Sequence, residues 1–228
     1  MIDAEHLEQA EEFREIYKIS EHDELYRKGK IFATCVMRPT DHEQAIADKI
    51  VRAGLFEWYA VFLDCFFVTR YKNVKQVDVI AVGKSGFFVL ESKDYNGWIF
   101  GRGRNEKWTE VRYKKKFQFY NPILQNESHI ETVRDVAGEK ANYYSVVVFG
   151  NEATLKKVEQ VPDDAYVVAD DKMLSTLETI IETKPECLTE EEMLEICRKI
   201  NLARLPRSNK MVEEHIRKAA AQKARYIL

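Results

Sequence analysis

The sequence has few cysteines and no pattern among them. The four cysteines, at positions 35, 65, 187 and 197, form no C-x-x-C pair and no zinc-binding spacing, so we expect reduced thiols. No segment reaches the roughly 18 apolar residues that a membrane span needs, and the acidic N-terminus lacks the apolar core of a signal peptide. These absences predict a soluble cytoplasmic protein without a membrane segment.

The sequence also lacks internal repeats, low-complexity segments and a large net charge. Its 228 residues carry a formal charge of -3, which excludes a chain that binds polyanions through its overall charge. The length suffices for one core domain, with or without a helical appendage. Local clusters of charge are therefore more informative than the total.

The most informative stretch is QVDVIAVGKSGFFVLESK, at positions 76–93. Two runs of β-branched and aromatic residues flank Gly83-Lys84-Ser85-Gly86, which predicts a tight hairpin. A two-residue loop at Lys84-Ser85 would fix the register of the two strands. The expected facing pairs are Val82 with Phe87, Ile80 with Val89, Asp78 with Glu91, and Gln76 with Lys93.

This register places Asp78 and Glu91 side by side at the end of an apolar face, with Lys93 on the same face and Gln76 placed to help orient it. Like charges in facing positions are destabilising. A divalent cation bound by both carboxylates offsets that cost, and hard oxygen ligands suit magnesium or manganese. The alternative is a solvent-exposed sheet end carrying an ordinary Glu-Lys ion pair.

A basic segment follows the hairpin. Its cations are Arg102, Arg104, Lys107, Arg112, Lys114, Lys115 and Lys116, against only Glu106 and Glu110. Basic residues so close to two carboxylates favour a polyanionic substrate, which they would draw toward a negative site. Four aromatic residues are interleaved with them: Tyr113, Phe117, Phe119 and Tyr120. Stacking on nucleic-acid bases is one interpretation, and packing in the core is the commoner one.

The remaining patterns predict helices and strands around this hairpin. Helices are expected over 2–18, from Pro39-Thr40, from Asn121-Pro122, from Asp170 or Asp171 through Ile181, from Thr189, and from about Ser208. Strands are expected over 62–70, 98–101, 108–113, 143–150 and 165–169. Asn96-Gly97 is a strong turn signal. Together they predict an α/β fold with a mixed sheet between helices.

Three helical residues have competing interpretations. Thr40-x-x-Glu43 fits a capping box, and this competes with a catalytic role for Glu43. Gln125 and His129 lie one turn apart and share a helix face. For Gln125 the alternatives are a site residue or a solvated one. His129 is either a core histidine or a contact to phosphate or water.

Asp78 followed by Glu91-Ser92-Lys93 on the adjacent strand resembles the D...(D/E)-x-K core of the PD-(D/E)xK nuclease superfamily. More specifically, QVDVIAV, GFFVLESKDYNGWIFG, the following tryptophan and NPILQN resemble the nuclease-related domain, or NERD, family. The likeness runs from about Glu43 to about Val148, with a weaker similarity to Ile181. Val77 stands where the superfamily's classical proline would be.

The resemblance implies a restriction-endonuclease-like mixed β-sheet flanked by helices, and a magnesium-dependent nuclease acting on nucleic acid, with DNA favoured. In that family pattern Asp78 and Glu91 hold Mg²⁺, for which Mn²⁺ can substitute, and the backbone carbonyl of Ser92 adds a ligand. Lys93 positions or activates the attacking water. Glu43 and Gln125 match the helical glutamate and the later glutamine of the pattern.

We therefore expect a nuclease domain over residues 39–182, with helical extensions over 1–38 and 183–228. Two alternatives remain open. In the first, the fold is a catalytically silent module that binds nucleic acid or a partner. In the second, the terminal helices bind partners or a second copy of the chain, as in a homo-oligomer, and the protein has a role in assembly.

Overall fold

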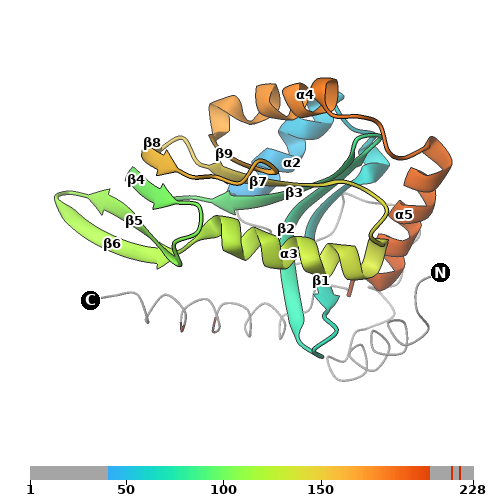
Figure 1. Cartoon of the computed structure of the whole chain (residues 1–228), viewed down its shortest axis with the longest axis horizontal. Helices are drawn as coiled ribbons and strands as arrows, with labels where there is room; N and C mark the ends of the chain where they lie inside the picture. Colours follow the sequence, from blue (N-terminus) through green and yellow to red (C-terminus); the bar gives the residue numbers. More distant parts are fainter. Residues whose placement is uncertain (1–40, 206–216, 218–220, 222–228) are drawn as a thin grey trace.

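The computed structural model describes residues 41–205 together with positions 217 and 221 (Figure 1). The helix expected over 2–18 and almost all of the last expected helix lie outside the described residues, as do Thr40 and Cys35. Cys65, Cys187 and Cys197 are free thiols. The described helices include none that is long and apolar enough to cross a membrane.

The first sheet has five strands in the order β1-β2-β3-β7-β9. They are β1 (Val61–Val68), β2 (Val74–Gly83), β3 (Gly86–Lys93), β7 (Tyr143–Phe149) and β9 (Ala165–Ala169). The first three are antiparallel, and β7 runs parallel to both β3 and β9, so the sheet is mixed. Every residue of β7 is buried, as its continuous apolar sequence predicts.

The predicted hairpin register is confirmed for two of its four named pairs, those nearest the turn. Val82 pairs with Phe87 and Ile80 with Val89 across the Lys84-Ser85 turn. The ladder ends at the pair of Val79 with Leu90, so the two strands separate where the carboxylates begin. The predicted pairs of Asp78 with Glu91 and of Gln76 with Lys93 lie outside this ladder, so the placement of Gln76 opposite Lys93 is wrong.

Gln76 lies three residues beyond the end of the ladder between β2 and β3. It pairs with Phe66 of β1, and its amide donates to Oδ1 of Asp64 at 2.6 Å. The orienting partner of Lys93 therefore has to come from another element.

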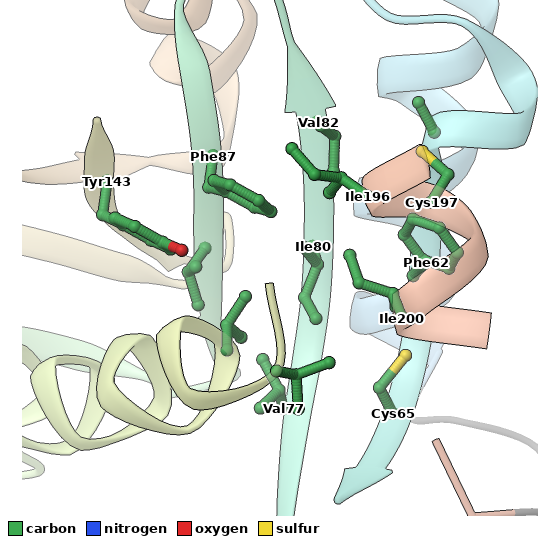
Figure 2. Packing of buried hydrophobic residues seen from close by; sticks show 14 of the residues in the cluster. Phe62, Cys65, Val77, Ile80, Val82, Phe87, Tyr143, Ile196, Cys197 and Ile200 are labelled. Atoms are coloured by element: carbon green, nitrogen blue, oxygen red, sulfur yellow. The ribbon is translucent and has the colours of Figure 1, made fainter. Parts of the chain in front are cut away.

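Helices cover both faces of this sheet (Figure 1). One face packs against α2 (Asp41–Ala53) and α4 (Met173–Thr183), and the other against α3 (Pro122–Ala137) and α5 (Glu190–Ala203). Figure 2 shows the second of these cores, where Ile196 and Ile200 of α5 lie beside Phe62 and Ile80 of the sheet.

The helix starts follow local chemistry. The side chain of Asn121 accepts from Ile123 N, with proline at the first helical position of α3. Thr189 and Glu192 form a reciprocal capping box at the start of α5, where the sequence predicts a helix. Asp170 lies in a short 3₁₀ turn, η4 (Asp170–Lys172), and caps no helix through its side chain. It forms an ion pair with Lys49 instead.

The strands divide between two sheets. The second has the order β6-β5-β4-β8, with β4 (Gly97–Arg102), β5 (Lys107–Arg112), β6 (Lys115–Tyr120) and β8 (Ala153–Glu159). It extends to the left of the body in Figure 1. β4 and β5 are predicted, whereas β6 and β8 are not: β6 begins with two lysines of the basic segment, and three of the seven residues of β8 are charged. Trp108 and Phe119 pack on Phe149 and join the two sheets.

Candidate active site

The candidate site lies where β2 and β3 separate. Asp78 and Glu91 are buried there, with exposed fractions of 9% and 1%, although both are acidic. Lys93 follows two residues after Glu91 on the same face of β3, toward helix α3. Burying two carboxylates next to each other costs free energy unless cations compensate them.

Lys93 supplies the first positive charge. Its ammonium group forms an ion pair with Oε1 of Glu91 and donates to Oε1 of Gln125 at 3.1 Å. Burial alone would lower the pKa of Lys93, but Glu91 and Asp78 outweigh burial and hold this pKa above its ordinary value. Lys93 is therefore charged, and two acceptors fix its position.

His129 is the second neighbour of Glu91. Its Nδ1 lies 3.0 Å from Oε2 of Glu91, close enough for an ion pair, but the ring and the carboxylate are not aligned for a hydrogen bond. Burial acts to raise the pKa of Glu91, and Lys93 and His129 reverse this and lower it to about 2. Helix α3 thus brings Gln125 and His129 to the site on one face, as their spacing predicts.

The pKa of Asp78 is shifted in the direction opposite to that of Glu91. Burial, then Glu91 and Glu43, raise its pKa well above the ordinary value, and Lys93 and the backbone of Ser92 only partly oppose this. The N–H of Ser92 donates to Oδ2 of Asp78 at 2.9 Å. Environments that push the pKa values of neighbouring carboxyl groups apart are typical of catalytic sites.

Glu43 reaches toward this site from helix α2. Its exposed fraction is 8%, and its charge is close enough to raise the pKa of Asp78. Thr40, the other half of the expected capping box, lies outside the described residues. The structure thus places Glu43 in the electrostatic surroundings of Asp78, and its catalytic role stays a prediction.

Asp78 and Glu91 offer some, but not all, of the ligands that a divalent cation needs. Oε1 of Glu91 is paired with Lys93, and Oε2 is buried without an aligned hydrogen bond although His129 lies 3.0 Å away, so a cation would have to share these oxygens with both neighbours. Within the described ranges, no three His, Cys, Asp or Glu side chains converge into a complete metal cage. A cation here would need ligands from the backbone, water or substrate, as is usual for magnesium.

The residues of this site lie within a segment that matches a known protein family. The family model described as "Nuclease-related domain" matches residues 38–150, which include Asp78, Glu91, Lys93 and Gln125. Residues 38–150 belong to the NERD family. An uncharacterized protein of Bacillus anthracis is 28% identical over 138 residues, which cover 60% of this chain and 64% of that relative. No solved structure matches this chain significantly.

A polar cluster behind the NERD site escaped the sequence analysis. Nδ1 of His42 lies 2.7 Å from Oγ of Ser92, and its Nε2 is 3.9 Å from Oδ1 of Asp170, which also pairs with Lys49. Burial lowers the pKa of His42 despite the neighbouring Asp170 and Asp94. This cluster fixes Ser92 from the face opposite Lys93. Only the position of His42 beside Glu43 hinted at it.

The basic segment of the NERD domain lies on the second sheet and its turns. Six of its seven cations are exposed: Arg102, Arg104, Lys107, Lys114, Lys115 and Lys116. Arg112 is half-buried, with its guanidinium 5.2 Å from the centre of the Phe117 ring. The aromatic residues divide, because Phe119 is core whereas Tyr113 is 93% exposed. Binding of nucleic acid by this segment stays a prediction.

Proposed function

We propose that this NERD domain is a metal-dependent nuclease that hydrolyses phosphodiester bonds, with DNA as the favoured substrate and Mg²⁺ or Mn²⁺ as the cofactor. The observation that carries the proposal is Lys93, held between Glu91 and Gln125 beside the buried carboxyl group of Asp78. A plain surface ion pair needs neither this burial nor the third partner.

The residues have separate roles in this proposal. Asp78 and Glu91 would hold the cation, with the carbonyl of Ser92 as a further ligand. When bound, the cation supplies a hydroxide near neutral pH and stabilises charge on the phosphate oxygens. Lys93 orients the attacking water and donates to the phosphate oxygen on which negative charge grows. Gln125 holds the ammonium group of Lys93 in place, and Glu43 adds negative charge near Asp78.

The exposed basic segment suits a polyanionic substrate. The affinity for such a substrate depends on the positive charge of this segment more than on any one of its residues. The reason is that counterion release from phosphate contacts dominates non-specific affinity. β4, which begins four residues after Lys93, leads from the negative site into this basic segment. This arrangement supports nucleic acid over a small neutral substrate.

Supercoiled plasmid incubated with the purified protein and Mg²⁺ tests the proposal. We expect nicking or cutting that EDTA stops and that Asp78→Asn, Glu91→Gln and Lys93→Met each reduce by at least about a hundredfold. Glu178→Gln on the exposed side of α4 is the matched control, because Glu178 lies in a helix on the other face of the sheet. Equal cutting by all variants would identify a contaminating nuclease.

A second candidate is a silent module that binds nucleic acid without turnover. The observation that favours it is the paired state of Glu91, which already has Lys93 and His129 as neighbours. Melting in a Mg²⁺ titration separates the two functions, because only a cation that binds the folded protein raises the melting temperature. Magnesium-dependent stabilisation lost in Asp78→Asn supports the enzyme, and no stabilisation supports the silent module.

A further inference from the structure

A pocket of about 400 Å³ lies beside the turn between β5 and β6. Trp98 and Tyr113 line it, with exposed fractions of 52% and 93%. Trp108, the other tryptophan of this sheet, is 1% exposed and packs in the core. Large aromatic side chains left in solvent around a hollow are typical of a binding surface.

Cations surround these rings. Nζ of Lys156 lies 4.9 Å from the centre of the Trp98 ring. Arg112 and Lys114 line the pocket, against a single carboxylate in the lining, that of Glu152. Flat aromatic faces combined with excess positive charge suit a ligand that has both a planar ring and a phosphate.

The turn itself has an unfavourable sequence. Arg112 pairs with Lys115, so Tyr113 and Lys114 form a two-residue loop, and their φ angles are 50° and 65°. Asn-Gly is the preferred sequence for such a turn, because side chains with a bulky Cβ resist positive φ. The backbone thus gains nothing from Tyr113 and Lys114, which points to their side chains as the reason for their presence.

We propose that this pocket binds an unpaired nucleotide, whose base stacks on Trp98 and Tyr113 while Arg112, Lys114 and Lys156 contact the adjoining phosphates. A base inside a duplex has both faces covered by its neighbours, so stacking on a protein ring requires a single strand or an unpaired end. The pocket therefore selects single-stranded nucleic acid over duplex.

The pocket is close to the candidate active site along the chain. Asn96 lines the pocket and follows Lys93 by three residues, so their Cα atoms are at most about 11 Å apart. A strand that enters the pocket would therefore need only a few nucleotides to reach the site, since stacked nucleotides rise about 3.4 Å each. The inference rests on the proposed nuclease function for its consequence, which is cutting a few nucleotides from the stacked base, but the binding itself needs no cleavage.

Binding without metal tests the inference with the full chain. Affinities are measured in EDTA by the fluorescence anisotropy of labelled strands. The protein should bind oligothymidylate more tightly than it binds a duplex or an abasic strand of equal length. We expect Trp98→Ala to weaken oligothymidylate binding about tenfold or more and to leave abasic-strand binding unchanged. Trp58→Ala is the matched control, because Trp58 is 51% exposed on η3 (Trp58–Ala60), and it should change binding less than twofold.

A turn variant separates binding from folding. Tyr113→Asn combined with Lys114→Gly installs the preferred turn sequence, so the protein should be at least as stable as the wild type while single-strand binding falls. Lys114→Gly alone controls for the lost charge. An oligouridylate arm shows whether the unpaired nucleotide is taken from DNA, RNA or both.

The outcomes distinguish the two proposals. Three results would overturn the stacking site. The wild type binds base-bearing and abasic strands with equal affinity, it binds no single strand, or Trp98→Ala and Trp58→Ala lose the same amount of affinity. Metal-dependent cutting that persists in any of these cases would leave the nuclease function intact. Base-dependent binding without cutting at any Mg²⁺ concentration would retain the stacking site and reject the nuclease.

Discussion

The ammonium group of Lys93, at the end of β3, donates a hydrogen bond to Oε1 of Gln125 in the first turn of α3, at 3.1 Å. The same ammonium group pairs with Glu91. Replacing Gln125 by Leu removes one of these two anchors and leaves the charge of the site unchanged. We expect cleavage to slow by about 10- to 100-fold, the range typical of residues that orient a metal-site group, as measured by plasmid-nicking rates at saturating Mg²⁺.

Glu131→Gln is the control for that experiment. Glu131 is an exposed residue further along the same helix, so its replacement tests for a general effect of altering α3. A Gln125→Leu enzyme that cuts at the wild-type rate would show that Gln125 does not position Lys93.

The ion pair between Glu91 and Lys93 makes a prediction about stability. Removing only the lysine leaves a carboxylate that is 1% exposed with His129 as its nearest compensation. Lys93→Met should therefore lower the free energy of unfolding by about 3–5 kcal/mol, as measured in urea. The double variant Glu91→Gln/Lys93→Met should recover most of this loss, because it removes both charges. If the two changes are simply additive, the pair is not energetically coupled.

Part of this site was predictable from local sequence. The register of the hairpin follows from the Gly-flanked turn and the alternation of apolar residues, which is why the pairs Val82 with Phe87 and Ile80 with Val89 are found as predicted. The separation of the strands beyond Val79 was not predictable. At that point the side chain of Asp78 accepts the N–H of Ser92, and the side chain of Gln76 donates to Asp64.

Contacts between distant residues account for most of what the sequence did not show. His42 meets Ser92 across 50 positions, and no local pattern connects the two residues. β8 has three charged residues among seven, and it pairs in parallel with β4, a strand more than 50 positions earlier in the chain. Such contacts are properties of the packed layers, and periodicity within one segment carries no signal of them.

The contact between His42 and Ser92 should contribute to the stability of the protein and have little effect on its activity. Ser92→Ala removes a hydrogen bond of 2.7 Å and keeps the backbone N–H that binds Asp78. We expect a loss of about 1 kcal/mol in the free energy of unfolding and a nicking rate within a few-fold of the wild type. Ser92→Pro, which removes the N–H as well, should abolish nicking. A large loss of rate in Ser92→Ala would mean that the side chain itself takes part in the reaction.

Asp78 predicts a trade-off between stability and function. Because its pKa is raised above the ordinary value of 3.8, the unfolded chain releases its proton more readily than the folded one as the pH rises. The wild type therefore loses stability above about pH 4, a loss that is complete once the pH passes the folded pKa. Asp78→Asn keeps the acceptor for Ser92 and avoids this cost.

In EDTA at neutral pH we expect Asp78→Asn to melt about 2–6 °C above the wild type, with the gap shrinking toward pH 4. Mg²⁺ should raise the melting temperature of the wild type only, and so narrow or reverse the gap. Thermal unfolding monitored across pH and Mg²⁺ concentration provides the measurement. A variant that is less stable than the wild type in EDTA at neutral pH would contradict this account of the buried carboxyl group.

Asn121 connects the basic segment to the helix that carries Gln125. Its side chain is fully buried, its Oδ1 accepts from Ile123 N at 2.9 Å, and its Nδ2 donates to the carbonyls of Gly103 and Asn105 at 2.7 and 2.8 Å. At an ordinary exposed N-cap, aspartate replaces asparagine at little cost. Here Asn121→Asp turns the donor into a carboxylate oxygen that faces two carbonyls.

We therefore expect Asn121→Asp to cost about 3 kcal/mol or more, as measured in urea. Thr189→Asp at the exposed N-cap of α5 should change stability by less than about 0.5 kcal/mol, because both residues cap well. Nicking should fall as well in Asn121→Asp at temperatures where the protein is still folded, since the loop from Gly103 to Asn105 and the start of α3 lose their shared anchor. Equal costs at the two N-caps would show that Asn121 acts only as a cap.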